Sequence, residues 1–311
     1  MTVQSQPHVL AIGEALIDVV VTYEQPDFPF EIPGGSPAKV ALTLGRLGRP
    51  VALATWFGAD TLGRLIDFHM NDSGVYVTPA SRGASHTSTA LARLDENGAA
   101  SYTFDLEWAP TAPIEVPETA QIIEAGSISA IIEPGASAVL DALARGREHA
   151  LVFFDPNARP SIMGEPAVAL VSLERFIALA DVVKVSDEDI EWLTGGVPID
   201  KVVNRWLGMG PSLVVVTRGK HGSDVATASG LRFTKTTSDV EVVDTVGAGD
   251  SFMGGMIDAM WGMSLRGADA REALRTLPEE QVRAIIDRAS AVSDVTVSRK
   301  GANPPWAHEL S

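Results

Sequence analysis

The sequence predicts an α/β fold in which strands and helices alternate. Apolar runs of four to six residues at 8–12, 51–56, 151–154 and 213–216 are each followed by a turn. Helical patterns separate several of these runs, and repeated strand-then-helix units favour a mostly parallel sheet covered by helices. Single α/β domains can reach 311 residues, and no linker interrupts the pattern. We therefore predict one domain that spans residues 1–311.

Composition narrows the classes of function. The net charge of −16 argues against nucleic acids and anionic membranes as partners. The absence of cysteine excludes disulfides and thiolate metal sites. The first apolar stretch, 9–21, is interrupted by Glu14 and Asp18, so it is neither a signal peptide nor a membrane span. We expect a cytoplasmic protein.

The first strand leads to a candidate ligand-binding carboxylate. Residues 8–12 are expected to form a buried strand that ends at Gly13, and Asp18 follows shortly after it. In open α/β sheets, ligands bind beyond the carboxyl ends of the strands. Asp18 is therefore a candidate for substrate binding, although an exposed acid in a turn would give the same pattern.

The segment that begins at Gly34 and Gly35 predicts a helix start. Ser36 is a suitable N-cap, and Pro37 suits the first helical position. The two glycines would let the backbone approach a ligand closely. Lys39 would lie in the first turn, where the helix dipole disfavours a cation. Its side chain either extends into solvent or contacts the substrate, and the second case favours an acceptor with an anionic group.

One hairpin interrupts the α/β pattern. From residue 87 to 93 polar and apolar residues alternate, a turn with an Asn-Gly pair follows at 95–98, and a second strand is expected at 101–104. Two alternating strands joined by such a turn predict a β-hairpin. In a chain of strand-and-helix units, this hairpin is an insertion.

A glycine-rich segment near residue 247 carries the clearest chemistry. We expect a strand at 240–243, then the turn, then a helix that contains Phe252. The amides of 247–249 would lie at the positive end of that helix and could bind anionic oxygens, and Asp250 would be ionised in its first turn. An anion site beside a carboxylate suits phosphoryl transfer to an alcohol. A Gly-x-Gly turn before a helix is also common as a purely structural feature.

Residues 244–252, Asp-Thr-Val-Gly-Ala-Gly-Asp-Ser-Phe, resemble the C-terminal signature of the ribokinase-like (PfkB) carbohydrate kinases. The Gly-Gly element resembles the first signature of this family, except that Lys39 replaces the usual sugar-binding Asn. Three further segments are similar to fructokinases: Gly-Glu-Ala-Leu-Ile-Asp at 13–18, Asp-Pro-Asn-Ala-Arg-Pro at 155–160 and Lys-Val-Ser-Asp-Glu at 184–188. The similar elements cover nearly the whole chain in family order.

The resemblance implies a doubly wound, mostly parallel sheet flanked by helices, with a small β-sheet lid formed from about 14–33 and 86–110. It implies an ATP-dependent sugar kinase that transfers the γ-phosphoryl group to a sugar hydroxyl, with fructose as the first choice. The alternatives are a 2-keto-3-deoxygluconate kinase, another PfkB sugar or nucleoside kinase, or a non-catalytic regulatory protein that binds sugar and ATP. Lids in this family often pair across a homodimer.

The resemblance also assigns roles to individual residues. Asp250 would be the catalytic base, with Gly247, Ala248 and Gly249 as the anion hole. The residues that would bind the sugar are Asp18, Gly34, Gly35, Lys39, Phe104 and Arg159. ATP would be bound by Asn157, Ser186, Thr217, Arg218, Gly219 and Gly222. Mg²⁺ would be held through water by Asp155 and Asp189. The family usually has Glu at the position of Asp189, and the neighbouring Glu188 is an alternative candidate for the same role. Asp244 would help to hold a monovalent cation such as K⁺.

Overall fold

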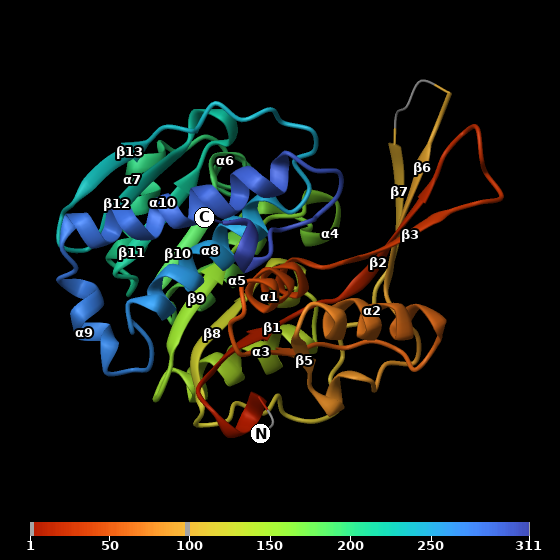
Figure 1. Ribbon diagram of the computed structural model, residues 1–311, viewed down its shortest axis with the longest axis horizontal. Coiled ribbons are helices and arrows are strands. Elements are labelled where there is room, and N and C mark those ends of the chain that lie inside the picture. Colours follow the sequence, from red (N-terminus) through yellow and green to blue (C-terminus); the bar gives the residue numbers. More distant parts are fainter. Residues whose placement is uncertain (1–2, 97–99, 311) are drawn as a thin grey trace.

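The computed structural model describes residues 3–96 and 100–310. It contains one large sheet between two layers of helices and one small sheet that projects from this body (Figure 1). Among the described residues the large sheet has nine strands in the order β13-β12-β11-β10-β9-β8-β1-β4-β5. All its neighbouring strands are parallel except the edge hairpin β11-β12-β13. The prediction of a mostly parallel α/β sheet is confirmed.

The bounds of the elements are as follows. The strands of the large sheet are β1 His8–Ile12, β4 Val51–Ala54, β5 Val75–Val77, β8 Ala120–Gly126, β9 Leu151–Asp155, β10 Val182–Ser186, β11 Leu213–Thr217, β12 Ser223–Thr227 and β13 Arg232–Lys235. The helices are α1 Ser36–Arg46, α2 Thr61–Asp72, α3 Gly135–Gly146, α4 Pro160–Met163, α5 Pro166–Ile177, α6 Asp187–Thr194, α7 Ile199–Leu207, α8 Ala248–Gly262, α9 Ala270–Arg275 and α10 Glu279–Val297.

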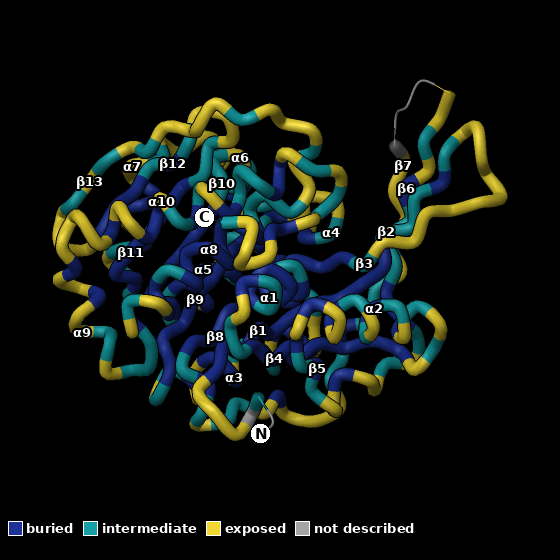
Figure 2. Tube along the Cα trace, in the orientation of Figure 1, coloured by how far each residue is buried: buried dark blue, intermediate teal, exposed yellow. Residues whose placement is uncertain are grey.

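The sheet is covered on both faces because its central strands are apolar on both sides. On β1, Val9 packs with α1, α8 and α10, whereas Leu10 packs in a second core with α3, α5 and α7. The five residues of β1 are all buried. Figure 2 shows the resulting continuous buried centre. No helix within the described residues has both the length and the apolar character needed to cross a membrane.

The small sheet, here called the lid sheet, has the order β3-β2-β6-β7. Its strands are β2 Leu16–Val21, β3 Phe30–Gly34, β6 Thr89–Leu94 and β7 Ala100–Asp105. Two antiparallel hairpins are joined by the parallel pair β2 and β6. The sheet extends away from the body in Figure 1, and much of it is exposed in Figure 2. The predicted hairpin is confirmed, whereas Asn97 and Gly98 of its turn lie outside the described residues.

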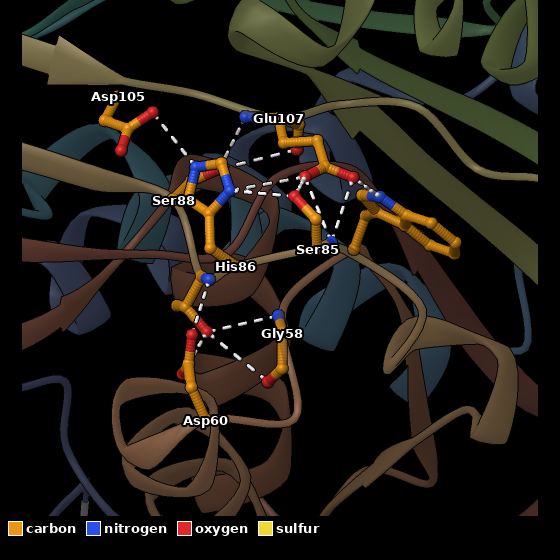
Figure 3. Close-up of polar contacts among 9 residues, drawn as sticks. Gly58, Asp60, Ser85, His86, Ser88, Asp105 and Glu107 are labelled. Carbon is orange, nitrogen blue, oxygen red and sulfur yellow. Dashed lines mark hydrogen bonds and ion pairs between the residues drawn. The ribbon is translucent and has the colours of Figure 1, made fainter.

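Two carboxylates fasten the lid sheet to the body at its base (Figure 3). Asp60 caps α2 by accepting from Gly63 N at 2.8 Å, and it also accepts from Thr87 N at 2.8 Å and from Thr87 Oγ1 at 2.7 Å. Thr87 lies just before β6. Because one carboxylate bonds both α2 and this segment, the base of β6 is fixed to the body.

The second carboxylate, Glu107, follows the end of β7. It accepts hydrogen bonds from the Ser85 hydroxyl and from Trp56 Nε1, the latter at 3.1 Å. The bond from Ser85 lowers the pKa of Glu107, which keeps the carboxylate charged. His86 lies between this group and Asp105, with Nε2 at 3.0 Å from Asp105 Oδ1 (Figure 3). Both strands of the β6–β7 hairpin are therefore tied together where they leave the body.

The prediction of a strand at 240–243 is wrong. The segment has no strand structure and is largely exposed at Val242 and Val243. Two backbone amides, those of Val243 and Asp244, donate instead to the carbonyl oxygen of Val297 at the end of α10. An apolar run forms a strand only where a neighbouring strand can pair with it. Here the partner is a single carbonyl.

Candidate active site

The carboxylate of Asp250 lies where the first turns of two helices meet. Gly247 precedes α8 in a left-handed conformation with φ 79°, which favours glycine. Asp250 is in the first turn of α8 and is only 6% exposed. Its Oδ1 accepts from the Ser36 hydroxyl at 2.7 Å and from Asn157 Nδ2 at 3.4 Å. These bonds orient a carboxylate at the positive end of a helix, which is suitable for a general base.

Ser36 therefore has a different role from the predicted N-cap. Helix α1 already begins at Ser36, its N-cap is Gly35, and no side chain caps it. The Ser36 hydroxyl donates to Asp250 instead. The helix start was located correctly, but the hydroxyl contacts a residue 214 positions away in the chain. The contact between Ser36 and Asp250 was not predicted from the sequence, because no local pattern indicates it.

The residues predicted to bind the sugar lie together at the base of the lid sheet. A Cβ added to Gly34 would lie 2.4 Å from Asp18 Oδ2, so the carboxylate lies directly against this glycine. Gly35 has φ 100°, a conformation that favours glycine. Burial raises the pKa of Asp18, whereas the nearby positive charges of Lys39 and Arg159 oppose this rise. The predicted acceptor site therefore contains one carboxylate and two cations.

Phe104 lies on the same face of the lid sheet as Asp18. Strand pairing places Ala90 beside both of them. The Phe104 ring stacks on Tyr102, with ring centroids 6.1 Å apart and planes inclined by 6°. This position is consistent with contact to a substrate held at Asp18, and that role stays a prediction.

A cavity of about 690 Å³ extends from the edge hairpin to the first turn of α8. Its walls include residues predicted to bind ATP and the anion, namely Thr217, Gly219, Gly222, Ala248 and Gly249. Parts of the 236–242 segment and one face of α10 also line the cavity. Since one end of this apolar cavity meets the helix N-terminus, its shape suits a nucleotide whose phosphates point toward Asp250.

Other residues predicted to bind ATP make different contacts. Arg218 does not line this cavity, and its Nη1 donates to Asp224 at 3.1 Å. Ser186 is the N-cap of α6, where its hydroxyl accepts from Asp189 N at 3.0 Å. Asn157 lies beside Asp250. Of these three, Asn157 is near the reacting groups, and its role stays a prediction.

The carboxylates predicted to act on Mg²⁺ already have protein partners. Asp155 is fully buried, and its Oδ2 lies 2.7 Å from Lys184 Nζ. Asp189 accepts from Ala158 N at 3.0 Å and from Ser186 N at 3.3 Å. Asp155 Oδ1, however, is buried without a hydrogen-bond partner among the described residues. It could accept from a metal-bound water, so the site fits an ion that keeps its waters and takes its other ligands from phosphate.

No three side chains of the described part form a metal cage. Residues 3–96 and 100–310 contain no group of three or more His, Cys, Asp or Glu side chains placed to hold an ion. Asp244, predicted to help bind a monovalent cation, accepts from Val246 N at 3.0 Å and Gly301 N at 2.8 Å. The Val246 N–H in particular lowers the pKa of Asp244. The carboxylates of the described residues therefore do not define a metal site by themselves.

Three buried charged residues were not assigned a role from the sequence. Lys184 pairs with Asp155, and Glu124 lies fully buried with both carboxylate oxygens unpartnered among the described residues. Burial, reinforced by the Asp155 charge, raises the pKa of Glu124 well above its usual value. Glu14 accepts from Ser36 N at 3.1 Å and from Ser129 N at 3.3 Å. In the sequence, a single lysine among the valines of β10 was the signal that could have identified Lys184.

The chain is similar to known carbohydrate kinases over most of its length. The pattern of the pfkB family of carbohydrate kinases matches residues 6–309. The chain is 30% identical to a probable fructokinase-2 of Arabidopsis thaliana over 95% of this chain and 92% of that protein. It is 32% identical to a fructokinase of Rhizobium leguminosarum bv. trifolii over 81% of this chain and 79% of that protein.

Solved structures give the same result. A fructokinase from Xylella fastidiosa with bound ATP superimposes with a TM-score of 0.81 at 26% identity, covering 97% of both chains. A fructokinase from Vibrio cholerae O395, bound to fructose, ADP and calcium ion, gives 0.76 at 27% identity over 96% of this chain and 95% of that one. The agreement of the family pattern, the relatives and the architecture shows that this chain belongs to the pfkB family of carbohydrate kinases.

Proposed function

We propose that this protein is an ATP-dependent fructokinase, which transfers the γ-phosphoryl group of ATP to a hydroxyl group of fructose. The observation that carries the proposal is the position of Asp250. Its carboxylate lies in the first turn of α8, whose amides meet the 690 Å³ cavity, and it bonds Ser36, which follows the Gly34–Gly35 pair beside Asp18. The fructokinases among its relatives support fructose as the acceptor.

In the proposed reaction, Asp18 and the backbone at Gly35 hold the sugar, and Asp250 receives the proton of the attacking hydroxyl. The amides at 247–249 stabilise the negative charge on the transferring group. A bound Mg²⁺ would neutralise phosphate charge near Asp155. The lid sheet excludes water, which would otherwise compete with the sugar.

The two cations beside Asp18 favour a second acceptor. Lys39 and Arg159 both act electrostatically on Asp18, although the chain as a whole carries a charge of −16. A sugar acid such as 2-keto-3-deoxygluconate would bring a carboxylate to these cations. The variant Lys39→Asn separates the two acceptors. It should weaken use of the acid sugar by tenfold or more and leave or improve use of fructose.

The test is ADP release with Mg·ATP and fructose, 2-keto-3-deoxygluconate, ribose or nucleosides. The wild type is compared with Asp250→Asn, which keeps the shape of the side chain but removes the base. We expect turnover to fall by about 10² or more, while the dissociation constant of ATP changes little. Asp200→Asn removes the same charge from an exposed position and serves as the control. ATP binding without turnover on any acceptor would support the regulatory alternative.

We also propose that the lid sheet pairs across a homodimer. The face that carries Asp18 also carries Phe30, Ile32 and Tyr102, which are 53%, 46% and 62% exposed. Exposed apolar side chains gathered on one face favour an interface. Tyr102→Glu should raise the dimer dissociation constant in sedimentation experiments, and a monomeric wild type would contradict the proposal. We expect a cytoplasmic protein, since its proposed cosubstrate ATP is available there.

A further inference from the structure

Lys184 is a buried cation in the centre of the large sheet. It lies on β10 with valine on either side, and it is only 3% exposed. Val183 and Val185 belong to the core that includes α5 and α7, so the alternation of the strand directs Lys184 toward the opposite face, which α8 covers. Removing an ammonium group from water costs several kcal/mol. A strand that served only the core would be more stable with an apolar residue at this position.

The ammonium group lies directly beneath the predicted anion hole. A Cβ added to Gly249 would be 2.7 Å from Lys184 Nζ. Gly249 lies within α8 and has no positive φ, so the backbone conformation does not require glycine there. The Lys184 side chain explains this glycine. The second glycine of the Gly-x-Gly segment leaves room for a cation.

Asp155 holds this cation in place. The two groups are 2.7 Å apart, and both side chains are almost completely buried. The Lys184 ammonium group donates a hydrogen bond to the buried Asp155 carboxylate, and a paired opposite charge at this distance stabilises the charged form of lysine. Lys184 therefore stays charged. A cation at the positive end of a helix is unfavourable in the empty protein, and it becomes favourable when an anion arrives above that end.

We propose that Lys184 is a positioning residue for phosphoryl transfer, a fixed positive charge beneath Gly249 that strengthens the anion hole, and that Asp155 holds it there. The proposal rests on the proposed kinase function. Because the charge on the transferring group is stabilised most in the transition state, Lys184 should affect kcat more than the affinity for ATP.

The absence of cysteine from the chain allows a chemical test. In Lys184→Cys, the introduced thiol is alkylated in denaturant with 2-bromoethylamine, which restores an ammonium group on a chain of nearly the same length. A matched sample is alkylated with 2-bromoethanol, which fills the same space without charge. Both samples and the wild type are refolded by the same procedure, and ADP binding and circular dichroism check the fold.

We expect the ammonium adduct to have a kcat within about threefold of the refolded wild type. The neutral adduct should lose about 10² in kcat, the range found when one anion-hole group is removed, with the KM for ATP changed by less than about threefold. Equal kcat values for the two adducts would overturn the proposal, because a purely structural role needs only the volume.

A second measurement does not depend on the sugar. The affinity for ADP with Mg²⁺ and aluminium fluoride, which imitates the transferring group, should be about tenfold weaker in the neutral adduct, with ADP alone unaffected. If the ammonium adduct and the neutral adduct bind ADP with aluminium fluoride equally well, the proposed role of Lys184 is overturned, whether or not a sugar is phosphorylated. The proposal for Lys184 and the proposed kinase function can therefore fail independently. Lys184→Met, prepared without refolding, should show the same losses, and wild-type values in it would also overturn the proposal.

Discussion

Replacing Glu14 by Gln should change how the stability of the protein depends on pH. Glu14 follows β1, is 6% exposed and accepts two backbone N–H groups, from Ser36 and Ser129. Burial raises its pKa from 4.5 to about 7, although hydrogen bonds, including the one from Ser36 N, favour the charged form. Gln keeps the size of the side chain but cannot lose a proton, so the comparison isolates the titration.

The sign follows from the protons bound in each state. Between pH 4.5 and 7 the folded protein keeps a proton on Glu14 that the unfolded chain has lost, so the free energy of unfolding decreases as the pH rises through this window. The shift from 4.5 to about 7 is roughly 2.5 units, and each unit corresponds to about 1.4 kcal/mol. Relative to the wild type, Glu14→Gln should therefore gain about 3 kcal/mol between pH 4.5 and pH 8.

The assay is urea unfolding of both proteins at pH 5, 6, 7 and 8, followed by tryptophan fluorescence. The exposed Glu118→Gln controls for the loss of one negative charge. A stability difference between wild type and Glu14→Gln that is the same at all four pH values would contradict this prediction. In that case Glu14 would keep its charge on folding despite its burial.

Three other substitutions test packing, catalysis and the lid base. Gly45→Ala should lower the free energy of unfolding by about 2 kcal/mol or more, because its Cβ would lie 2.2 Å from the backbone oxygen of Ser73. Gly262→Ala is the control: its nearest neighbour is an arginine side-chain end at 3.6 Å, so urea unfolding should show no loss. Ser36→Ala should reduce kcat about tenfold with the KM for ATP unchanged, since it removes one hydrogen bond of roughly 1.4 kcal/mol to the proposed base Asp250; an unchanged kcat in steady-state assays would exclude that role. Thr87→Val keeps the backbone N–H bond to Asp60 but removes the hydroxyl bond to Asp60 and the acceptor of Gly58 N. It should cost about 1–2 kcal/mol of stability, and an unchanged midpoint in urea would argue against that anchor.

Local patterns in the sequence predicted the frame of the fold. The apolar run at 8–12 became the buried strand β1, and the alternating residues from 87 became a hairpin. The start of α1 beside Gly35 was also located from the sequence. These elements are specified by neighbouring residues, through side-chain periodicity and the conformational limits of glycine and proline.

Contacts between distant segments could not be predicted in this way. The run 240–243 has the composition of a strand but lacks a strand to pair with. Ser36 is a good N-cap by composition, yet it bonds Asp250. The packing of Lys184 against Gly249 depends on how the sheet and α8 are assembled. Each of these features depends on how distant segments pack together in the folded protein, and local sequence patterns carry no information about that packing.

The bond between Ser36 and Asp250 also bears on synthesis of the protein in the cell. The two residues are 214 positions apart, and ribosomes add about 5–20 residues per second. Ser36 is therefore made about 10 to 40 s before its partner. During this interval β1 can pair with β4, and later with β8, but Asp250 and helix α8 have not yet been made. Strands β1 and β4 are thus available for pairing well before Asp250, and the candidate active site can assemble only after Asp250 has been made.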